Sequence, residues 1–338
     1  MAGTNLDRGR GKIQGTFLMP DSARPTVVVA RKLLPAGLDL LAECEVRVGG
    51  LDVERPTLLE LVAGADALIA DPTVPVDGEL LDAAGPQLRV VSNFAVGYDN
   101  IDVEACRERG VVVTNTPGVL TNATAELALE LTLAAARCAS EAEATLRAGR
   151  WTGWDPGAML GLELSRATFG IVGLGRIGGR YAELVRPLAG EILYVARSAK
   201  PDRERELGAR RVELDELLER SDVVSLHAPA SPETRHLIGA AELERMRPHA
   251  VLVNTGRGTL VDSAALARAL ADGQIGAAGL DVYENEPDVP EELLRAPRCV
   301  LLPHIGSATH TARDAMAELA ARNALAVLAG EEPPHRVA

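Results

Sequence analysis

The sequence predicts an α/β protein built from two doubly wound parallel-sheet domains. Short apolar runs alternate with stretches of helical spacing, and this alternation starts again near residue 168 after one long helical stretch. Strands that are apolar throughout and separated by helices are typical of parallel sheets covered on both faces. A chain of 338 residues is also long enough for roughly two domains of about 100–200 residues each.

The first block of the chain supplies a series of strands with helices between them. Residues 26–30 are short and apolar, and residues 35–43 then carry apolar side chains at helical spacing. A second helix is predicted at 57–63. The remaining strand candidates follow at residues 45–48, 67–70, 88–95 and 111–115. This order of elements predicts a βαβ domain.

A long helical pattern separates the two blocks. Thr121 or Asn122 can cap it, and Gly149 can end it. We expect one helix over 121–148, and its length indicates that it bridges two lobes or packs in a dimer. The following segment, 151–161, holds two tryptophans, three glycines and a proline, so we expect an exposed loop there.

The second block repeats the alternation of strands and helices. It begins with an apolar strand at 168–173. Its further strand candidates lie at residues 192–196, 222–226, 250–254, 277–282 and 299–302. A last helix is predicted over 308–328. If that helix returns to the first block, the first domain is discontinuous in sequence.

The composition excludes several classes of function. Lys and Arg number 35 and Asp and Glu number 48, which gives a net charge of 35 − 48 = −13. A duplex-binding protein needs a basic face, and only 3% of the residues are aromatic, so we expect no nucleic-acid partner. An acidic protein can still bind a small anion where a few cations and backbone N–H groups are focused locally.

Neither membrane segments nor metal sites are indicated. No apolar run reaches the ~18 residues of a spanning helix, so we expect no membrane partner. Residues 1–24 are polar and lack the apolar centre of a signal peptide, so we interpret them as a flexible tail of a cytoplasmic protein. No metal site is expected, because no metal-ligand spacing appears among the cysteines, which are Cys44, Cys106, Cys138 and Cys299.

A glycine-rich turn follows the first strand of the second block. Gly173, Gly175 and Gly178 form the pattern G-x-G-x-x-G between an apolar strand and a helical stretch. The first glycine permits the tight turn, the second lets the backbone approach a pyrophosphate, and the third lets helix and strand pack closely. The turn predicts a dinucleotide site at the helix N-terminus. A glycine turn that binds nothing is the alternative.

The end of the next strand indicates which dinucleotide is bound. NAD sites usually carry an acidic residue there, which binds the ribose 2′-OH. Here Arg197 and Ser198 follow the strand instead, and an arginine can pair with a 2′-phosphate. We therefore expect NADP(H) to be preferred, with NAD(H) possible because Asp202 and Glu204 follow closely. The simpler alternative is that Arg197 is a solvated surface residue.

Three later strand ends carry polar residues of catalytic type. Arg257, Glu286 and His304 each lie just beyond an apolar strand. Ligands of open α/β sheets bind outside the carboxyl ends of the strands, so the three side chains can converge on one cleft. Taken singly, each is more simply explained as a surface ion pair or a structural histidine. Together, beside a dinucleotide turn, they predict an active site.

These motifs make the chain similar to the D-isomer-specific 2-hydroxyacid dehydrogenase family, most of all to its glyoxylate/hydroxypyruvate reductases. The resemblance covers about residues 27–334 and depends on residues 93–101 (NFAVGYDNI), the glycine turn and the three polar strand ends. It implies a Rossmann cofactor domain, 119–306, inserted in a flavodoxin-like substrate domain. The substrate domain would comprise 25–118 plus 307–338.

The resemblance also implies a reaction. A small 2-oxo acid, glyoxylate or hydroxypyruvate, would be reduced by hydride from NAD(P)H, with His304 as the proton donor. Arg257 would bind the carboxylate and polarise the carbonyl, and Glu286 would favour the imidazolium. Further substrate contacts are implied for Val96, Gly97 and Ser307. Cofactor contacts are implied for Gly173, Leu174, Gly175, Arg176, Ile177, Gly178, Arg197, Ser198, Pro229, Thr255, Asp281 and Gly306.

The same resemblance implies a homodimer through the 121–148 helix and the 151–161 loop. In similar reductases this loop reaches the cleft of the neighbouring subunit, which gives Trp151 and Trp154 a place in the partner's site. The alternative for these two side chains is simple packing of the loop.

Other readings of the scaffold stay open. A phosphoglycerate-type dehydrogenase shares the motifs but usually has an NAD-type acid and often an added regulatory domain. Formate dehydrogenases are similar too, but carry Gln where Glu286 stands. A dinucleotide-sensing, corepressor-like binding protein uses the same scaffold and can retain the three catalytic residues. Turnover of a 2-oxo acid distinguishes an enzyme from the binding protein.

Overall fold

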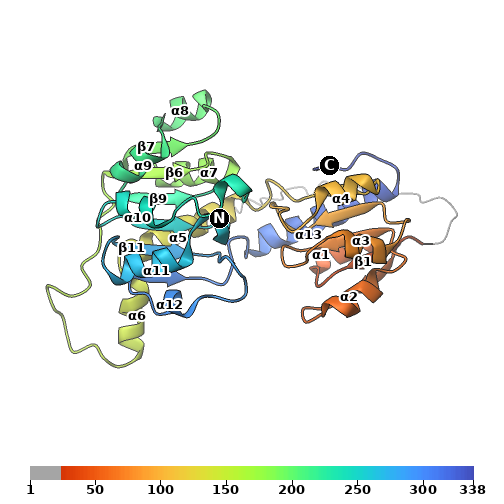
Figure 1. The fold of residues 1–338 in the computed structure, drawn as a ribbon, viewed down its shortest axis with the longest axis horizontal. Coiled ribbons are helices and arrows are strands. Elements are labelled where there is room, and N and C mark those ends of the chain that lie inside the picture. The colour runs from red at the N-terminus through yellow and green to blue at the C-terminus, as the bar shows by residue number, and fades with distance from the viewer. Residues whose placement is uncertain (1–23) are drawn as a thin grey trace, which may run out of the picture.

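The computed structural model describes residues 24–338, which form two α/β domains, each built on a parallel sheet. Figure 1 shows the two domains side by side, with the first sheet in red to orange. Residues 1–23, which are almost all of the predicted tail, lie outside the described residues. The predicted class, α/β with two parallel sheets, is confirmed.

The first sheet has the strand order β2-β1-β3-β4-β5, and all neighbouring strands are parallel. Because the order reverses between β1 and β3, the sheet is flavodoxin-like, as predicted. Its strands are β1 (Thr26–Val29), β2 (Glu45–Val48), β3 (Ala67–Ala70), β4 (Val90–Asn93) and β5 (Val112–Thr114). The helices between them are α1 (Pro35–Leu38), the 3-10 turn η1 (Asp39–Leu41), α2 (Arg55–Val62), α3 (Gly78–Ala84) and α4 (Val103–Glu108).

The second sheet has the order β12-β11-β10-β9-β6-β7-β8, which is the Rossmann arrangement extended by one strand. Its strands are β6 (Ala167–Val172), β7 (Ala189–Val195), β8 (Ala209–Arg211), β9 (Val223–Leu226), β10 (Val251–Asn254), β11 (Ala277–Leu280) and β12 (Cys299–Leu301). Its helical segments are α7 (Arg176–Val185), α8 (Pro201–Leu207), α9 (Leu214–Arg220), η2 (Pro232–Thr234), α10 (Ala240–Arg245), η3 (Gly258–Leu260), α11 (Ser263–Ala271) and α12 (Glu291–Leu294). The sequence did not predict β8, because two of its three residues are exposed arginines and no apolar run marks it.

The last helix, α13 (His310–Leu328), crosses back to the first sheet. Side chains alternate along β1, so Val27 belongs to the core beneath α13 while Val28 packs on the opposite face. Buried alanines of α13 let the helix lie close to the sheet, and Ser92 on β4 donates to the Ala320 carbonyl at 2.8 Å. The chain therefore leaves the first domain and returns to complete its core.

The prediction of one helix over 121–148 is wrong. The structure has two helices, α5 (Thr121–Ala136) and α6 (Ala139–Arg147). Between them Cys138 has a left-handed backbone with φ of +52°, through which a right-handed helix cannot continue. The reason is a tertiary contact, because the Cys138 side chain is buried and the Arg298 guanidinium lies 3.3 Å from its sulfur.

The expected exposed loop over 151–161 is confirmed. Trp151 is 64% exposed and Trp154 is 85% exposed, and no helix or strand forms in this segment. Among the helices of residues 24–338, none is both long enough and apolar enough to cross a membrane.

Gly178→Ala should destabilise the protein, whereas Gly179→Ala should not. A Cβ at 178 would lie 2.1 Å from the Gly173 carbonyl oxygen, so the turn and α7 would have to separate. A Cβ at 179 would lie no closer than 3.5 Å to the flexible Arg203 side chain, and alanine favours a helix. In urea unfolding we expect a loss of about 1–3 kcal/mol for the first change. The second should give a gain of up to about 1 kcal/mol. Equal unfolding free energies for the two variants would contradict the close approach.

Candidate active site

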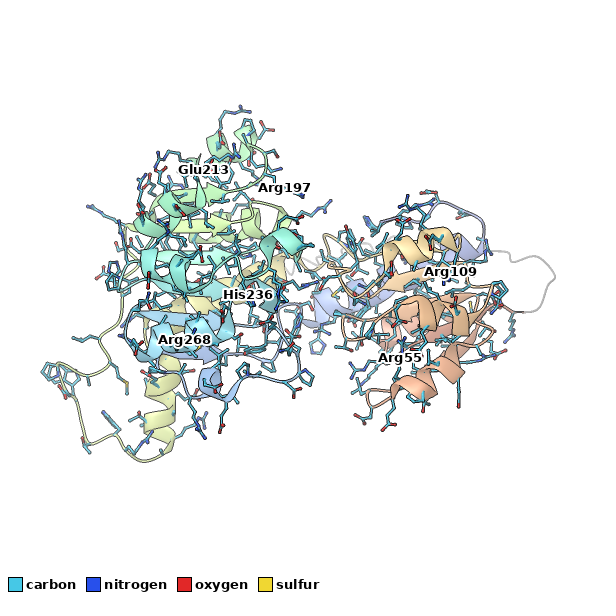
Figure 2. All side chains as sticks on the ribbon, viewed as in Figure 1. Arg55, Arg109, Arg197, Glu213, His236 and Arg268 are labelled. Atoms are coloured by element: carbon cyan, nitrogen blue, oxygen red, sulfur yellow. The ribbon has the colours of Figure 1, made fainter. Side chains whose placement is uncertain are left out.

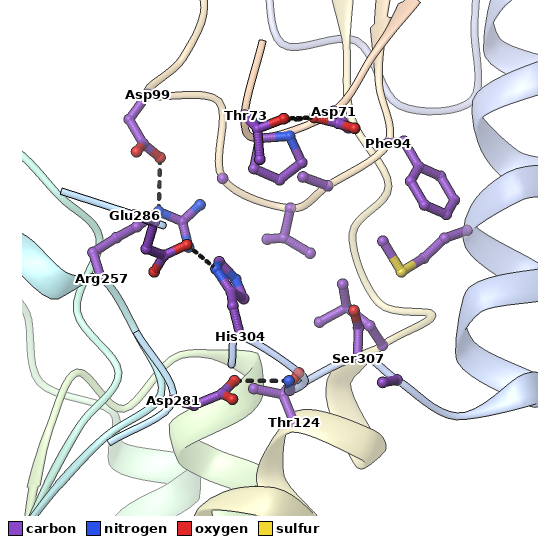
Figure 3. Close-up of a pocket in the computed structure, with 18 of the residues that line it drawn as sticks. Asp71, Thr73, Phe94, Asp99, Thr124, Arg257, Asp281, Glu286, His304 and Ser307 are labelled. Carbon is purple, nitrogen blue, oxygen red and sulfur yellow. Dashed lines mark hydrogen bonds and ion pairs between the residues drawn. The ribbon is translucent and has the colours of Figure 1, made fainter. Parts of the chain in front are cut away.

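A cavity of about 2320 Å³ is lined by strand ends and loops of both domains. Arg257, Glu286 and His304 all line it, and Figure 3 shows them together on one side, with Phe94 and α13 on the other. The other predicted site residues that line this cavity are Val96, Gly97, Gly175, Arg176, Ile177, Pro229, Thr255, Asp281, Gly306 and Ser307. The expected convergence of three strand ends on one cleft is therefore present in the fold.

Arg257 is held by groups from both domains. It follows β10, and its Nε donates to Asp99 Oδ1 at 2.9 Å, while Nη1 donates to the Gly256 carbonyl at 2.9 Å. Gly97 lies directly beside the guanidinium, because a Cβ at 97 would be 1.5 Å from Arg257 Nη2. Any side chain at 97 would therefore displace the guanidinium.

Val96 and Gly97 lie in the loop after β4, whose backbone N–H groups are available to an anion. The loop's carbonyls are engaged, since Asn115 donates to the Val96 oxygen and Asn93 to the Gly97 oxygen, both at 2.7 Å. Within residues 24–338, neither the Val96 N–H nor the Gly97 N–H has a hydrogen-bond acceptor. Two such amides beside a fixed guanidinium are the groups that a carboxylate requires.

His304 and Glu286 form a hydrogen-bonded pair. His304 Nδ1 lies 2.6 Å from Glu286 Oε2, and Glu286 Oε1 accepts from the Tyr283 N–H at 2.9 Å (Figure 3). Burial alone would raise the pKa of Glu286, but the hydrogen bonds from His304 and Tyr283 outweigh it and lower that pKa. Glu286 is thus a carboxylate at neutral pH, so Nδ1 is the donor in the pair and Nε2 is left for a ligand.

Asp281 fixes the loop that carries His304. Its two carboxylate oxygens accept the N–H groups of Ile305 and Gly306, both at 2.7 Å. His304 itself has φ of +52°, a left-handed conformation that a non-glycine residue keeps only where its surroundings impose it. Burial raises the pKa of Asp281, and the two N–H groups and His304 only partly offset this effect. The resemblance implied only a cofactor contact for Asp281, so this second role is new information from the structure.

The glycine turn has the geometry that its sequence predicts. Gly173 has φ of +96°, and a Cβ there would lie 2.8 Å from the carbonyl carbon of His227, so the turn packs against the end of β9. Directly after Gly175 the helix α7 begins. A Cβ at 175 would meet no described protein atom within 4 Å, although Gly175 lines the cavity. This cradle at a helix N-terminus fits a dinucleotide phosphate.

The remaining cofactor residues lie in different surroundings. Thr255 lines the cavity, and its buried Oγ1 has no hydrogen-bond partner within the described part of the chain, which fits a polar ligand group. Arg197 and Ser198 do not line the cavity and are exposed at the end of β7, where Figure 2 labels Arg197. Three further residues form the turn itself rather than the cavity wall, namely Gly173, Leu174 and Gly178.

Two arginines near the site were not predicted from the sequence. Arg313 on α13 lines the cavity. Arg211 on β8 donates to the carbonyl oxygens of Ala196 and Arg197 at 3.1 and 3.5 Å. Neither arginine belongs to a motif or follows a predicted strand, so their charge was the only signal in the sequence. Tertiary contacts place them.

A comparison with known protein families gives the affiliation of the chain. Residues 129–306 match the model of the D-isomer specific 2-hydroxyacid dehydrogenase, NAD binding domain. The chain belongs to the D-isomer specific 2-hydroxyacid dehydrogenase family. The matched segment contains the glycine turn, Arg257, Glu286 and His304, so a nicotinamide dinucleotide is the cofactor of this dehydrogenase.

Individual relatives resemble the dehydrogenase along almost its whole length. A glyoxylate reductase from Thermococcus litoralis is 47% identical, covering 93% of this chain and 97% of the relative. A solved structure of a Thermus thermophilus protein has a TM-score of 0.87 at 45% identity, covering 93% of this chain and all of the other. An NADPH-dependent glyoxylate/hydroxypyruvate reductase from Sinorhizobium meliloti, solved with NADP and malonate, has a TM-score of 0.82 at 36% identity, covering 94% of this chain and 97% of its own.

Proposed function

We propose that this dehydrogenase reduces a small 2-oxo acid, glyoxylate or hydroxypyruvate, to the 2-hydroxy acid with NADPH. One observation carries the proposal, namely that Arg257, the His304–Glu286 pair and the glycine turn meet at one cavity. An anion site, a proton donor and a dinucleotide site in one place are what a carbonyl reduction requires. Relatives named glyoxylate reductase support the substrate class.

The contacts of each residue give it a part in the reaction. The N–H groups of Val96 and Gly97 bind the carboxylate together with Arg257, which also polarises the carbonyl. The nicotinamide supplies the hydride. His304, protonated and hydrogen-bonded to Glu286, gives its Nε2 proton to the carbonyl oxygen as negative charge develops there.

The domains divide these tasks. We assign 25–118 plus 307–338 to the substrate domain and 119–306 to the cofactor domain. The loop after β4 then brings the amides for the carboxylate, while the second domain brings the guanidinium, the imidazole and the dinucleotide turn. Reduction would require the two domains to meet across the cavity.

Replacing Arg257 tests the proposed function most directly. Arg257→Ala should lower kcat/KM for glyoxylate-dependent oxidation of NADPH by about 10²–10³, because a donor aimed at developing negative charge is lost. Arg268→Ala, at an exposed arginine on α11, is the control and should behave as wild type (Figure 2). A folded Arg257→Ala enzyme with wild-type kcat/KM would contradict the role proposed for Arg257. NADPH binding without any turnover in wild type would favour a corepressor-like binding protein.

The His304–Glu286 pair makes a prediction about pH. Reduction consumes a proton, so kcat/KM should fall as the pH rises. The hydrogen bond from His304 lowers the pKa of Glu286, which therefore supplies a negative charge beside the proton donor. Glu286→Gln removes this charge, and the fall in kcat/KM should then begin at lower pH. Glu284→Gln is a matched control, since Glu284 bonds to His236 rather than to His304. An unchanged profile for Glu286→Gln, measured between about pH 5 and 9, would remove the proposed role.

The end of β7 supports a preference for NADPH. Arg197 and Ser198 lie there, and the Arg211 guanidinium is bound to the carbonyls of the same turn. Glu204 is the acid that the sequence offered for binding the ribose hydroxyls of NAD(H), but its carboxylate accepts a hydrogen bond from the Tyr194 hydroxyl. The same hydroxyl accepts the Lys200 N–H. Arg197 and Arg211 are cations that suit a ribose 2′-phosphate.

Cofactor preference can be tested at three arginines. A charge-assisted bond is worth about 1.5–3 kcal/mol, so wild type should prefer NADPH over NADH by about 10- to 100-fold in kcat/KM at saturating glyoxylate. Arg197→Ala should abolish this preference and Arg211→Ala should reduce it, with parallel losses in NADP⁺ affinity by calorimetry. Arg210→Ala should leave it intact, since Arg210 pairs with Glu216. Equal use of both cofactors by wild type would overturn the preference.

We also propose that the enzyme is a homodimer, formed through residues 121–148 and the 151–161 loop. The supporting observation is an apolar surface on these segments. Leu146 is 61% exposed and Leu160 is 68% exposed, beside the two exposed tryptophans. Exposed apolar side chains gathered on one segment are typical of a protein interface.

A further inference from the structure

Arg313 is a cation in the wall of the cavity without a protein partner. It lies one turn into α13, and its Nε is buried with no hydrogen-bond acceptor among the described residues. No ion pair or side-chain hydrogen bond joins its guanidinium to any other residue of 24–338. Burial lowers the pKa of Arg313, and the Asp281 and Asp71 carboxylates act against this effect from a distance.

Three other arginines of the cavity wall are bonded to protein groups, and Arg176, the remaining one, is exposed to solvent rather than half-buried. Arg257 donates to Asp99, and Arg31 donates to Thr73 Oγ1 at 2.7 Å and to a loop carbonyl. Arg55 is likewise bonded to a carbonyl and to two carboxylates. A half-buried guanidinium that the fold leaves without an acceptor costs stability, so Arg313 is expected to serve a ligand.

The reacting end of a 2-oxo acid already has its partners. The proposed function gives the carboxylate to the Val96 and Gly97 amides and to Arg257, and the carbonyl oxygen to Arg257 and His304. Arg313 comes from α13, which lies with Phe94 on the side of the cavity away from Arg257 (Figure 3). A donor on this side of the cavity would face the part of the substrate beyond the carbonyl.

We propose that Arg313 binds an oxygen carried by the substrate beyond its carbonyl carbon, so that the preferred substrates are 2-oxo acids with a hydroxyl or carboxylate on C3 or C4. The inference rests on the proposed function and narrows its substrate class. Phe94 and Met316 also line this cavity and are apolar, so Arg313 is the one of these three side chains that can distinguish an oxygen-bearing chain from a methyl group. Glyoxylate, which has no C3, would be reduced without its help.

The test compares four substrates in wild type and in Arg313→Met, which keeps a long side chain but removes the donors. Glyoxylate and pyruvate lack the distal oxygen, hydroxypyruvate carries a hydroxyl, and oxaloacetate carries a carboxylate. We expect kcat/KM to fall by about 10- to 100-fold for hydroxypyruvate or oxaloacetate, as for a lost bond to a charged group. Glyoxylate and pyruvate should change by less than about 3-fold, since they make no such bond. If kcat/KM falls more for hydroxypyruvate, Arg313 binds a hydroxyl, and if it falls more for oxaloacetate, Arg313 binds a carboxylate.

Two further variants keep the test decisive. Arg322→Met, on the same helix, is a matched control, because Arg322 is 54% exposed and pairs only loosely with Glu318 at 3.8 Å. Arg313→Lys retains the charge and should give an intermediate loss, and it replaces the Met variant if that protein does not fold. An equal fall for all four substrates, or no fall for any, would overturn the inference. A wild type inactive on all four would instead overturn the proposed function.

Discussion

The site depends most on two hydrogen bonds, which the backbone N–H groups of Ile305 and Gly306 donate to the Asp281 carboxylate. They tie the loop after β12 to the end of β11, at 2.7 Å for both bonds. These bonds fix the loop in which His304 keeps its left-handed conformation, with Nδ1 2.6 Å from Glu286 Oε2. A buried carboxylate, costly by itself, thus positions His304, the proposed proton donor.

Much of this arrangement could be predicted from the sequence, because its causes are local. Short apolar runs mark buried parallel strands, and the glycine pattern marks a turn whose positive φ and close approach need glycine. Polar residues just beyond three strands had to meet, since parallel strands end at one edge. The break at Cys138, the exposed strand β8 and the position of Arg313 could not be predicted, because each results from contacts between distant segments.

The proposed anion site of this acidic protein depends on local arrangement rather than on total charge. The net charge is −13, yet the cavity collects arginines and unbonded amides from both domains. Low-dielectric walls strengthen such fixed donors, and a net negative surface does little to a field focused within a few ångströms. Arginines whose donors are bonded to the protein, such as Arg31, have a structural role in the cavity wall, whereas arginines with unused donors can bind a ligand.

The position of Gly97 makes the proposed substrate site and the contact between the two domains one structural feature. The guanidinium of Arg257 occupies the space that a Cβ at 97 would take, and it reaches Asp99 across the cavity at 2.9 Å. The proposed anion site therefore needs the amides of one domain and the arginine of the other. In the proposed function, a carboxylate that bridges both sets of donors would stabilise this contact between the domains, so that binding energy from the non-reacting end of the substrate would help to align the reacting carbonyl with His304.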